Sequence, residues 1–496
     1  MLPFKTIREQ CDDDAVDDHL DSEEGKIVNL RHQDVLNNYM IPFILNQDQF
    51  RGKLLDLCQI KDVIEFENAF PKRYDSDRFD FVGSGSYAKV LRYRHTIMSN
   101  REQDRFGQKP LKSQLNKRTE IKYSIIKLIN VHSERFTKNL ARRNSNSISN
   151  YRNVYNEFRI SQTLSELNDG VHLNQYRYQC GLFPIVNNCH LVKNGPSVDE
   201  NFARIEHRTF DENDSFEKRS DNSMLSISSI EQYLCVKSEI AAIDMEDCGQ
   251  SLDCLLSDSF EPLKILSSVK QIIIGLMIAE EIFEFEHRDL HFGNILWRQI
   301  SDDYLNFIYQ NQSYRIPSSN VHIKVIDTTF SRMKINNQIF YRDLSELFND
   351  YNRDDLREEL TFSDHQNSLS ESYEEMANKI QSDWKEFHPR TNCIWLIYVL
   401  KIFLNKIKKK IGNYSPPSPQ ESSMSLSPFS SSPYSSFSFS KSSDSQSSSI
   451  EWRQIELILR KFILALNKSS NLTKFFHDVL MDPKMNILLP IEILQP

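Results

Sequence analysis

Long apolar runs alternate with strongly polar segments along this chain, and the apolar runs predict its ordered elements. Residues 124–129 and 239–245 are short and rich in isoleucine or alanine, which is typical of buried strands. The most apolar run, residues 265–279, follows Pro262, a residue that favours the first turn of a helix. Because this run of 15 residues is too short to span a bilayer, we expect a buried central helix.

A second helix is predicted near the C-terminal end. Ser448 and Glu451 have the spacing of a capping box, which predicts that the helix begins there. Its apolar face comprises Trp452, Ile455, Ile458, Leu459 and Phe462. We expect this face to dock on the larger, helical part of the molecule.

Three polar segments interrupt the apolar elements, at residues 99–118, 196–229 and 415–449. Serine makes up more than half of the last one, a composition that cannot bury a core. Its Ser-Pro pairs begin at Ser415, Ser418, Ser427 and Ser432. It is either a tolerated surface insertion or a phosphorylated regulatory loop. The basic residues 406–410 before it are either a nuclear-import signal or a lysine-rich helix end.

Composition narrows the class of protein. The net charge of −9 argues against non-specific DNA binding by the whole chain and suits a cationic substrate. Acidic runs at residues 12–18 and 21–24 predict a solvated, disordered tail. The 8 cysteines include no pair with CxxC spacing, so we expect reduced thiols inside a cell. The N-terminus lacks the pattern of a signal peptide.

The strongest candidate chemistry lies just after the central apolar run. Residues 287–294 read HRDLHFGN, which places Asp289 five positions before Asn294. In a protein kinase such an aspartate accepts the proton of an attacking hydroxyl, and the asparagine oxygen holds a magnesium ion. Short polar loops are common, so this motif needs support from others.

Residues 81–90 read FVGSGSYAKV and predict a glycine-rich turn over the phosphates of ATP. The alternative is an ordinary hairpin turn. The chain has only 12 glycines in 496 residues, well below the usual ~7%, so a pair at this spacing carries more weight than elsewhere. The turn predicts contacts to ATP from Val82, Gly83, Ser84, Gly85, Ser86 and Val90.

Lys127 lies inside the apolar strand 124–129, and a buried ammonium group needs an anionic partner. Glu157 follows 30 residues later, on a segment where Val154, Phe158 and Leu164 recur at roughly helical spacing. Alone, Glu157 would be read as part of a solvated helix face. Its position between Lys127 and Asp289 favours an ion pair that grips the nucleotide phosphates.

The last motif gives the chain a family resemblance. Residues 321–330 read VHIKVIDTTF, a strand that ends in Asp327, where a kinase places a magnesium-binding aspartate. The sequence DTTFSR at residues 327–332 resembles the haspin family of atypical protein kinases. His291, Phe292 and the block WKEFHPRTNCIWL at residues 384–396 also resemble that family, as does the absence of an Ala-Pro-Glu motif. The resemblance covers roughly residues 76–412.

The resemblance implies a bilobal α+β fold. An N-lobe with an antiparallel sheet and one helix is expected at residues 76–245, with insertions at 99–118 and 196–229. A mostly helical C-lobe is expected at residues 246–496, with an insertion at 415–449. Residues 1–30 are expected to form the disordered tail, and residues 31–75 an N-terminal extension.

The resemblance also implies ATP and Mg²⁺ as cofactors, with the metal held by Asn294 and Asp327. Asp289, Lys127 and Glu157 would be the catalytic residues. Met245 would line the back of the adenine pocket, and the backbone from Glu246 to Cys248 would bond the base of ATP. Ser251 would also contact ATP.

The implied substrate is a threonine, third in the basic N-terminal tail of histone H-three, phosphorylated in mitosis. Asp343, Glu346 and Asp253 would receive that tail. Ser251 stands where the family has an acidic residue, which weakens the histone assignment. The resemblance implies a chromatin-associated nuclear monomer, also present in cytoplasm, without sequence-specific nucleic-acid binding or a membrane. A pseudokinase scaffold, a kinase for another basic protein and a small-molecule phosphotransferase remain alternatives.

Overall fold

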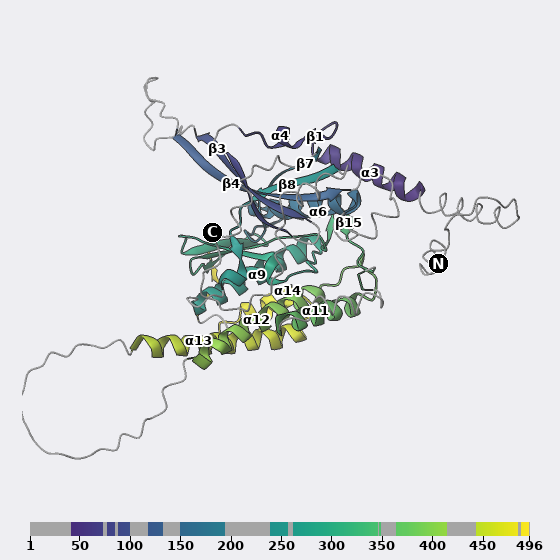
Figure 1. Cartoon of the computed structure of the whole chain (residues 1–496). Coiled ribbons are helices and arrows are strands. Elements are labelled where there is room, and N and C mark those ends of the chain that lie inside the picture. The colour runs from purple at the N-terminus through teal and green to yellow at the C-terminus, as the bar shows by residue number, and fades with distance from the viewer. Residues whose placement is uncertain are drawn as a thin grey trace, which may run out of the picture.

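The computed structural model describes residues 41–72, 77–84, 88–99, 118–131, 149–193, 239–255, 261–345, 347–348, 364–413, 443–484 and 488–495. These residues form two lobes, drawn one above the other in Figure 1. The upper lobe is built on a six-stranded sheet, and the lower lobe is mostly helical. The bilobal α+β fold expected from the sequence is therefore confirmed.

The N-lobe sheet has the order β1 (Ile64–Glu65), β7 (Val186–Lys193), β8 (Glu239–Glu246), β4 (Arg118–Val131), β3 (Lys89–Ser99) and β2 (Arg78–Ser84). Neighbouring strands are antiparallel except β1 and β7. Strand β3 pairs with β4 along its whole length, up to Ser99 and Arg118, so the predicted insertion joins the far ends of the two strands. Lys127 lies in the middle of the sheet, paired with Val90 and Ile243.

Helices cover both faces of this sheet. The helix α6 (Tyr151–Ser165) starts where the Asn150 side chain accepts a hydrogen bond from the backbone N–H of Asn153 at 2.8 Å, a typical N-cap. It packs with α3 (Ile41–Leu57) on one face, and α4 (Phe66–Ala69) covers the other. The N-terminal extension therefore contributes α3, β1 and α4 to the N-lobe.

The predicted central helix is α9 (Pro262–Phe283), which begins at a proline in its first turn. It is 22 residues long, so the expectation that it is too short to cross a membrane was wrong. By length and composition it could span a bilayer, but 89% of its most apolar window is buried inside the protein. Its burial, and not its length, marks it as the core helix of the C-lobe.

Among the described residues, the C-lobe also contains the helices α11 (Asp364–Ile380), α12 (Arg390–Asn413), α13 (Ser443–Lys468) and α14 (Leu472–Phe475). The predicted start of α13 at Ser448 was wrong, because the helix begins at Ser443. No glycine or proline lies between these positions to stop the helix. The predicted apolar face of α13 does pack into the C-lobe core. Residues 406–410 lie in the last turns of α12.

The C-lobe strands form small sheets. One contains β9 (Gln250–Ser251), β10 (Ile295–Gln299) and β13 (Val321–Val325), and another contains β11 (Tyr304–Tyr309), β12 (Gln312–Pro317) and β16 (Glu492–Ile493). Two hairpins are β5 (Val171–Leu173) with β6 (Tyr176–Tyr178) and β14 (Arg332–Ile335) with β15 (Gln338–Tyr341). Short helical turns are η2 (Glu166–Asn168), α8 (Leu252–Leu255), η4 (Phe292–Asn294) and η5 (Phe476–Leu480).

Two connections position the site. Antiparallel pairing of Ile295 with Val325 brings Asn294 and Asp327, which flank that pair, to the same end of the sheet. The crossing between the lobes runs from β8 to β9 through Gly249, whose φ is +96°. A Cβ atom there would lie 2.2 Å from the carbonyl oxygen of Trp297, so this close approach requires glycine.

Candidate active site

A cluster of charges lies between the lobes. The Nζ atom of Lys127, on β4, is 2.7 Å from Oε1 of Glu157 on α6 and 2.9 Å from Oδ1 of Asp327. The ion pair between Lys127 and Glu157 that the sequence predicts is present. Because Asp327 follows β13 of the C-lobe, a single ammonium group connects both lobes.

Charge coupling sets the protonation of this cluster. Burial alone would lower the pKa of Lys127, but the carboxylates of Asp327 and Glu157 outweigh it and raise that pKa. For Asp327, burial alone would raise the pKa, but the Lys127 ammonium group and hydrogen bonds from Thr329 hold that pKa well below its usual range. The ammonium group and the Asp327 carboxylate are therefore both charged at neutral pH.

Two threonines after Asp327 tie its loop to α6. The Thr328 hydroxyl donates to the backbone carbonyl of Glu157 at 3.2 Å and lies 2.8 Å from the hydroxyl of Ser161. The Thr329 hydroxyl lies 3.1 Å from Oε2 of Glu157 and also contacts the Asp327 carboxylate. These residues stand where most kinases have Phe-Gly, so the signal was in the sequence, but this role was missed.

Asp289 lies on the loop between α9 and η4. Its Oδ2 atom accepts a hydrogen bond from Nδ2 of Asn294 at 3.2 Å, and its Oδ1 atom accepts one from the hydroxyl of Tyr373. Burial raises the pKa of Asp289 to about 8, and the nearby Asp327 charge acts in the same direction. The hydrogen bonds from Tyr373 and Asn294 oppose that rise by favouring the ionised carboxylate.

His287 supports the backbone of this loop. Burial lowers its pKa to about 4, so the ring is neutral at pH 7. Its Nε2–H donates to the carbonyl of Ile326 at 3.0 Å, and its Nδ1 accepts from the N–H of Asp289 at 3.3 Å. A single ring proton satisfies both bonds. His287 therefore links Asp289 to the residue just before Asp327.

Arg288 is held by a buried ion pair. Two of its nitrogens donate to the carboxylate of Glu286 at 3.0 and 3.1 Å, and both side chains are fully buried. It also donates to the backbone carbonyl of Trp384 at 2.8 Å. The φ of Arg288 is +64°, a left-handed conformation that costs roughly 1–3 kcal/mol unless its surroundings hold it.

The block at residues 384–396 provides those surroundings. The backbone N–H of His388 and the hydroxyl of Thr391 donate to Glu286, each at 2.8 Å. Asn392 accepts from the N–H of His287 at 3.1 Å. The sequence identifies this block as a family feature but does not predict what it contacts. Glu286 was also missed, although it directly precedes residues 287–294.

The predicted nucleotide-binding residues of the N-lobe lie partly within the described strands β2, β3 and β8. Val82 is 48% exposed on β2, and Gly83 follows it, whereas Gly85, Ser86 and the side chain of Ser84 lie outside the described residues. Val90 and Met245 are half-buried on β3 and β8.

The backbone from Glu246 to Cys248, which is predicted to bond the base of ATP, is partly bonded within the protein. The N–H of Glu246 donates to the carbonyl of Ile185 at 2.8 Å. The Glu246 carboxylate pairs with Lys324 at 3.0 Å and Arg298 at 2.8 Å, so it supports the sheet. Only its carbonyl and the following residues remain for a base. Cys248 is buried, and burial raises the pKa of its thiol to about 12.

The predicted substrate-side residues are scattered. Ser251 donates to the carbonyl of Phe292 at 3.3 Å, which fixes the catalytic loop to the interlobe segment. Asp253 is exposed and close enough to His291 to affect its pKa. Asp343 is exposed after β15 and caps its own turn at Ser345 N–H, 2.9 Å away. Glu346 lies outside the described residues.

Residues 22–426 match the family described as the haspin like kinase domain, which is well over half of the chain. The chain belongs to the haspin-like kinase family.

Two relatives named serine/threonine-protein kinase haspin homolog are similar to part of this chain. The Drosophila melanogaster protein is 34% identical over 146 residues, which are 29% of this chain and 24% of that protein. The Arabidopsis thaliana protein is 35% identical over 165 residues, 33% of this chain and 25% of that protein. The chain thus spans about a quarter of the length of these relatives.

Asn294 and Asp327 of this haspin-like chain suit magnesium, which prefers oxygen ligands and takes one or two carboxylates alongside phosphate oxygens. The N–H of Ile326 donates to the carbonyl of Asn294 at 2.9 Å, which holds the two candidate ligands near each other. Nδ2 of Asn294 faces Asp289, so its Oδ1 atom is the free ligand atom. Among the described residues there is no group of three or more His, Cys, Asp or Glu side chains that suits a metal ion on its own.

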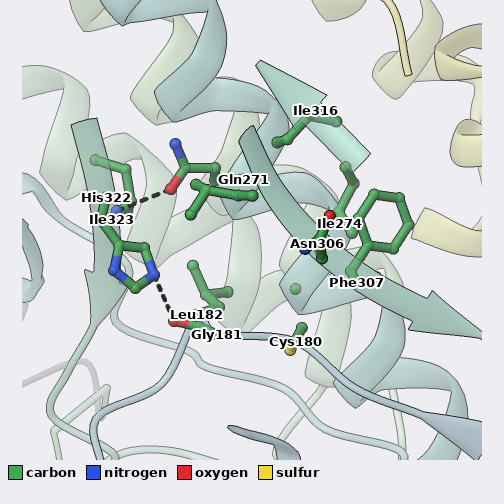
Figure 2. A pocket seen from close by; sticks show the side chains of 12 residues that line it. Cys180, Gly181, Leu182, Gln271, Ile274, Asn306, Phe307, Ile316, His322 and Ile323 are labelled. Atoms are coloured by element: carbon green, nitrogen blue, oxygen red, sulfur yellow. Dashed lines mark hydrogen bonds between the residues drawn. The ribbon is translucent and has the colours of Figure 1, made fainter. Parts of the chain in front are cut away.

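The cavity in Figure 2 belongs to another part of the haspin-like fold. It is lined by Cys180, Gly181, Leu182, Gln271, Ile274, Gly275, Leu305, Asn306, Phe307, Ile316, His322 and Ile323. Figure 2 shows two bonds across it, from His322 to the carbonyl of Gly181 and from the N–H of Ile323 to Gln271. None of the predicted site residues lines it.

Five cysteines are free and buried among the described residues: Cys58, Cys180, Cys189, Cys248 and Cys393. Cys11 and Cys235 lie outside the described residues, as does the side chain of Cys254.

Proposed function

We propose that this chain is a serine/threonine protein kinase that transfers the γ-phosphate of ATP to a threonine in a basic histone tail. The observation that carries the proposal is the double contact of the Lys127 ammonium group with Glu157 and Asp327, 2.7 and 2.9 Å away, beside Asp289. A pseudokinase has no need for all of these groups in one place.

Each residue would have a definite task. Lys127, oriented by Glu157, would neutralise the α- and β-phosphates of ATP. Gly83 and Val90 would contact the nucleotide from β2 and β3, and Met245 and Cys248 from the interlobe segment. Asn294 and Asp327 would hold Mg²⁺, which supplies charge neutralisation when bound.

Asp289 would orient the substrate hydroxyl and accept its proton. In the ionised form that accepts the proton, the Asp289 carboxylate has about four acceptor sites, and Tyr373 and Asn294 use two of them. The remaining lone pairs are available to the substrate. Positioning and charge neutralisation would therefore provide most of the rate, as in other phosphoryl transfers.

The substrate we propose is the N-terminal tail of histone H-three at its third residue, a threonine. It would be phosphorylated at chromosomes in the nucleus during mitosis. The chain is acidic, with a net charge of −9, and exposed Asp253 and Asp343 provide carboxylates for basic side chains. Charge complementarity of this kind also speeds encounter with a cationic peptide.

A phosphate-transfer assay tests the catalytic proposal. Radiolabelled ATP is supplied with mixed histones, with an acidic protein such as casein, and without protein. We expect label on histone, and Asp289→Asn should bind ATP normally but lose roughly 10²–10⁴-fold in kcat, since an amide cannot accept the proton. Label on no substrate would favour a scaffold, and full activity of Asp289→Asn would show that the mechanism is wrong.

Charge reversal tests the substrate. Asp343→Lys/Glu346→Lys should raise KM for a histone-tail peptide by roughly a hundredfold or more, because charge-assisted bonds are worth roughly 1.5–3 kcal/mol each when the peptide covers them. KM for ATP should stay nearly unchanged. The matched control is Asp302→Lys/Asp303→Lys, which reverses two exposed carboxylates before β11. If the peptide KM does not change, the acidic site lies elsewhere, with Asp253 the next candidate.

A further inference from the structure

Tyr373 enters the active site from α11, outside every motif that the sequence offers. Its hydroxyl donates to Oδ1 of Asp289, and Nδ2 of Asn294 donates to Oδ2 at 3.2 Å. Each carboxylate oxygen of Asp289 is therefore held by one side chain. The two donors come from different parts of the C-lobe, since Asn294 belongs to the loop that carries Asp289.

The phenol ring is fixed by aromatic neighbours. The Tyr373 ring meets Trp395 edge-on, with centroids 4.9 Å apart, and lies 6.0 Å from Phe348. Phe348 in turn stacks on Trp384 at 5.4 Å. Trp395 is fully buried, and its indole N–H donates to the sulfur of Met376 at 3.3 Å. This packing leaves the ring few orientations, so the position of its hydroxyl is defined.

His291 does not provide this contact. Its Nε2 atom is 3.8 Å from Oδ1 of Asp289, beyond hydrogen-bond distance, and its Nδ1 accepts from the N–H of Gly293 at 3.1 Å. Burial also lowers the pKa of His291, which favours the neutral ring. Among the described residues, the side chains of Tyr373 and Asn294 donate hydrogen bonds to the Asp289 carboxylate.

We propose that Tyr373 is a positioning residue for Asp289. The hydroxyl of Tyr373 sets the rotation of the Asp289 carboxylate, so that the unused lone pairs of that carboxylate face the substrate hydroxyl. This inference rests on the proposed role of Asp289. Tyr373 acts through Asp289 and contacts neither ATP nor peptide. Its loss should therefore lower kcat and leave both Michaelis constants nearly unchanged.

Tyr373→Phe isolates the hydroxyl, because phenylalanine keeps the ring against Trp395 and Phe348. We expect kcat to fall roughly 10- to 100-fold, the effect of one lost hydrogen bond to a charged group, with KM for ATP and for the peptide within about twofold of wild type. Tyr373→Leu, which also removes the ring, should lower both kcat and the melting temperature.

The matched control is Tyr314→Phe, a buried tyrosine on β12 whose ring stacks on Phe307 with centroids 5.0 Å apart. It should keep wild-type kcat. An unchanged kcat in Tyr373→Phe would overturn the proposal, and so would a higher kcat, which would mean that the hydroxyl competes with substrate. Equal losses in Tyr373→Phe and Tyr314→Phe would reduce the effect to core packing.

Asp289→Asn separates this inference from the proposed function. If Asp289→Asn is inactive and Tyr373→Phe behaves as wild type, only the role of Tyr373 fails. If Asp289→Asn is active, the catalytic role of Asp289 fails first. If both proposed roles are right, the double variant Asp289→Asn/Tyr373→Phe should be no slower than Asp289→Asn, because the two residues act as a unit.

Discussion

The two halves of the active site are held in different ways. On the N-lobe side, Lys127 and Glu157 form an ion pair that shares its ammonium group with Asp327, and Asp327 keeps a third of its side chain exposed. On the C-lobe side, Glu286 and Arg288 form a fully buried pair that reaches only backbone and neighbouring side chains. The first pair faces the place where ligands would bind, and the second faces the protein.

This difference distinguishes residues that would act on a ligand from residues that hold the backbone of the site. Charges that meet a ligand must keep some exposure, and their pKa values depend on one another. A buried pair with every partner supplied by the protein instead fixes the backbone, here the left-handed Arg288 next to Asp289. Mutations of the Lys127–Glu157 pair should therefore affect rate, and mutations of the Glu286–Arg288 pair should affect stability first.

Glu286→Ala should give the largest effect. It leaves Arg288 charged and buried without its carboxylate, and it removes an acceptor from His388 and Thr391. Breaking a buried pair in this way costs roughly 3–5 kcal/mol, which chemical unfolding would measure. The control is Glu456→Ala, which breaks an exposed helix pair with Arg460 and should cost under about 1 kcal/mol. Similar losses in both variants would contradict the comparison.

Lys127→Ala should act on rate. We expect kcat/KM to fall roughly 10²–10³-fold, as for other electrostatic groups that meet the reacting phosphates. Glu157→Ala should cause a smaller loss, because it affects the phosphates only through Lys127. Steady-state kinetics of both variants and their double variant measure the coupling. The double variant should be little slower than Lys127→Ala, and fully multiplicative losses would mean that the pair does not act together.

The sequence predicted the N-lobe half better than the C-lobe half. Lys127 could be found because a charged residue in an apolar strand needs a partner, and Glu157 lies on a helix with clear periodicity. Glu286 and Tyr373 could not be assigned in this way, since their partners at residues 384–396 and 289 are distant in sequence and come together only through packing of α11 and α12. The start of α13 was also missed, because serines are ambiguous between loop and helix.

Phosphatase treatment should leave the kinase activity unchanged, the smallest effect that we expect. Kinases that need activation use arginines to bind a phosphorylated residue in the segment after the magnesium-binding aspartate. Arg288 has no exposed surface, and its three side-chain nitrogens already donate to Glu286, Trp384 and Glu386. Arg288 therefore has no side-chain nitrogen available to bind a phosphate group. Thr328 and Thr329 meanwhile fix the Asp327 loop to α6 without modification.

Protein made in bacteria and treated with phosphatase should therefore phosphorylate a histone-tail peptide at the untreated rate. Replacing Ser345, Thr361 and Ser363 with alanine should change that rate by less than about twofold, because we expect activity not to depend on phosphorylation of this segment. Activity that appears only after incubation with a second kinase would contradict this, and would mean that the buried Glu286–Arg288 pair opens to accept a phosphate. Hydrogen exchange at residues 384–396 before and after that incubation would detect such opening, since the pair is closed by backbone carbonyls of that block.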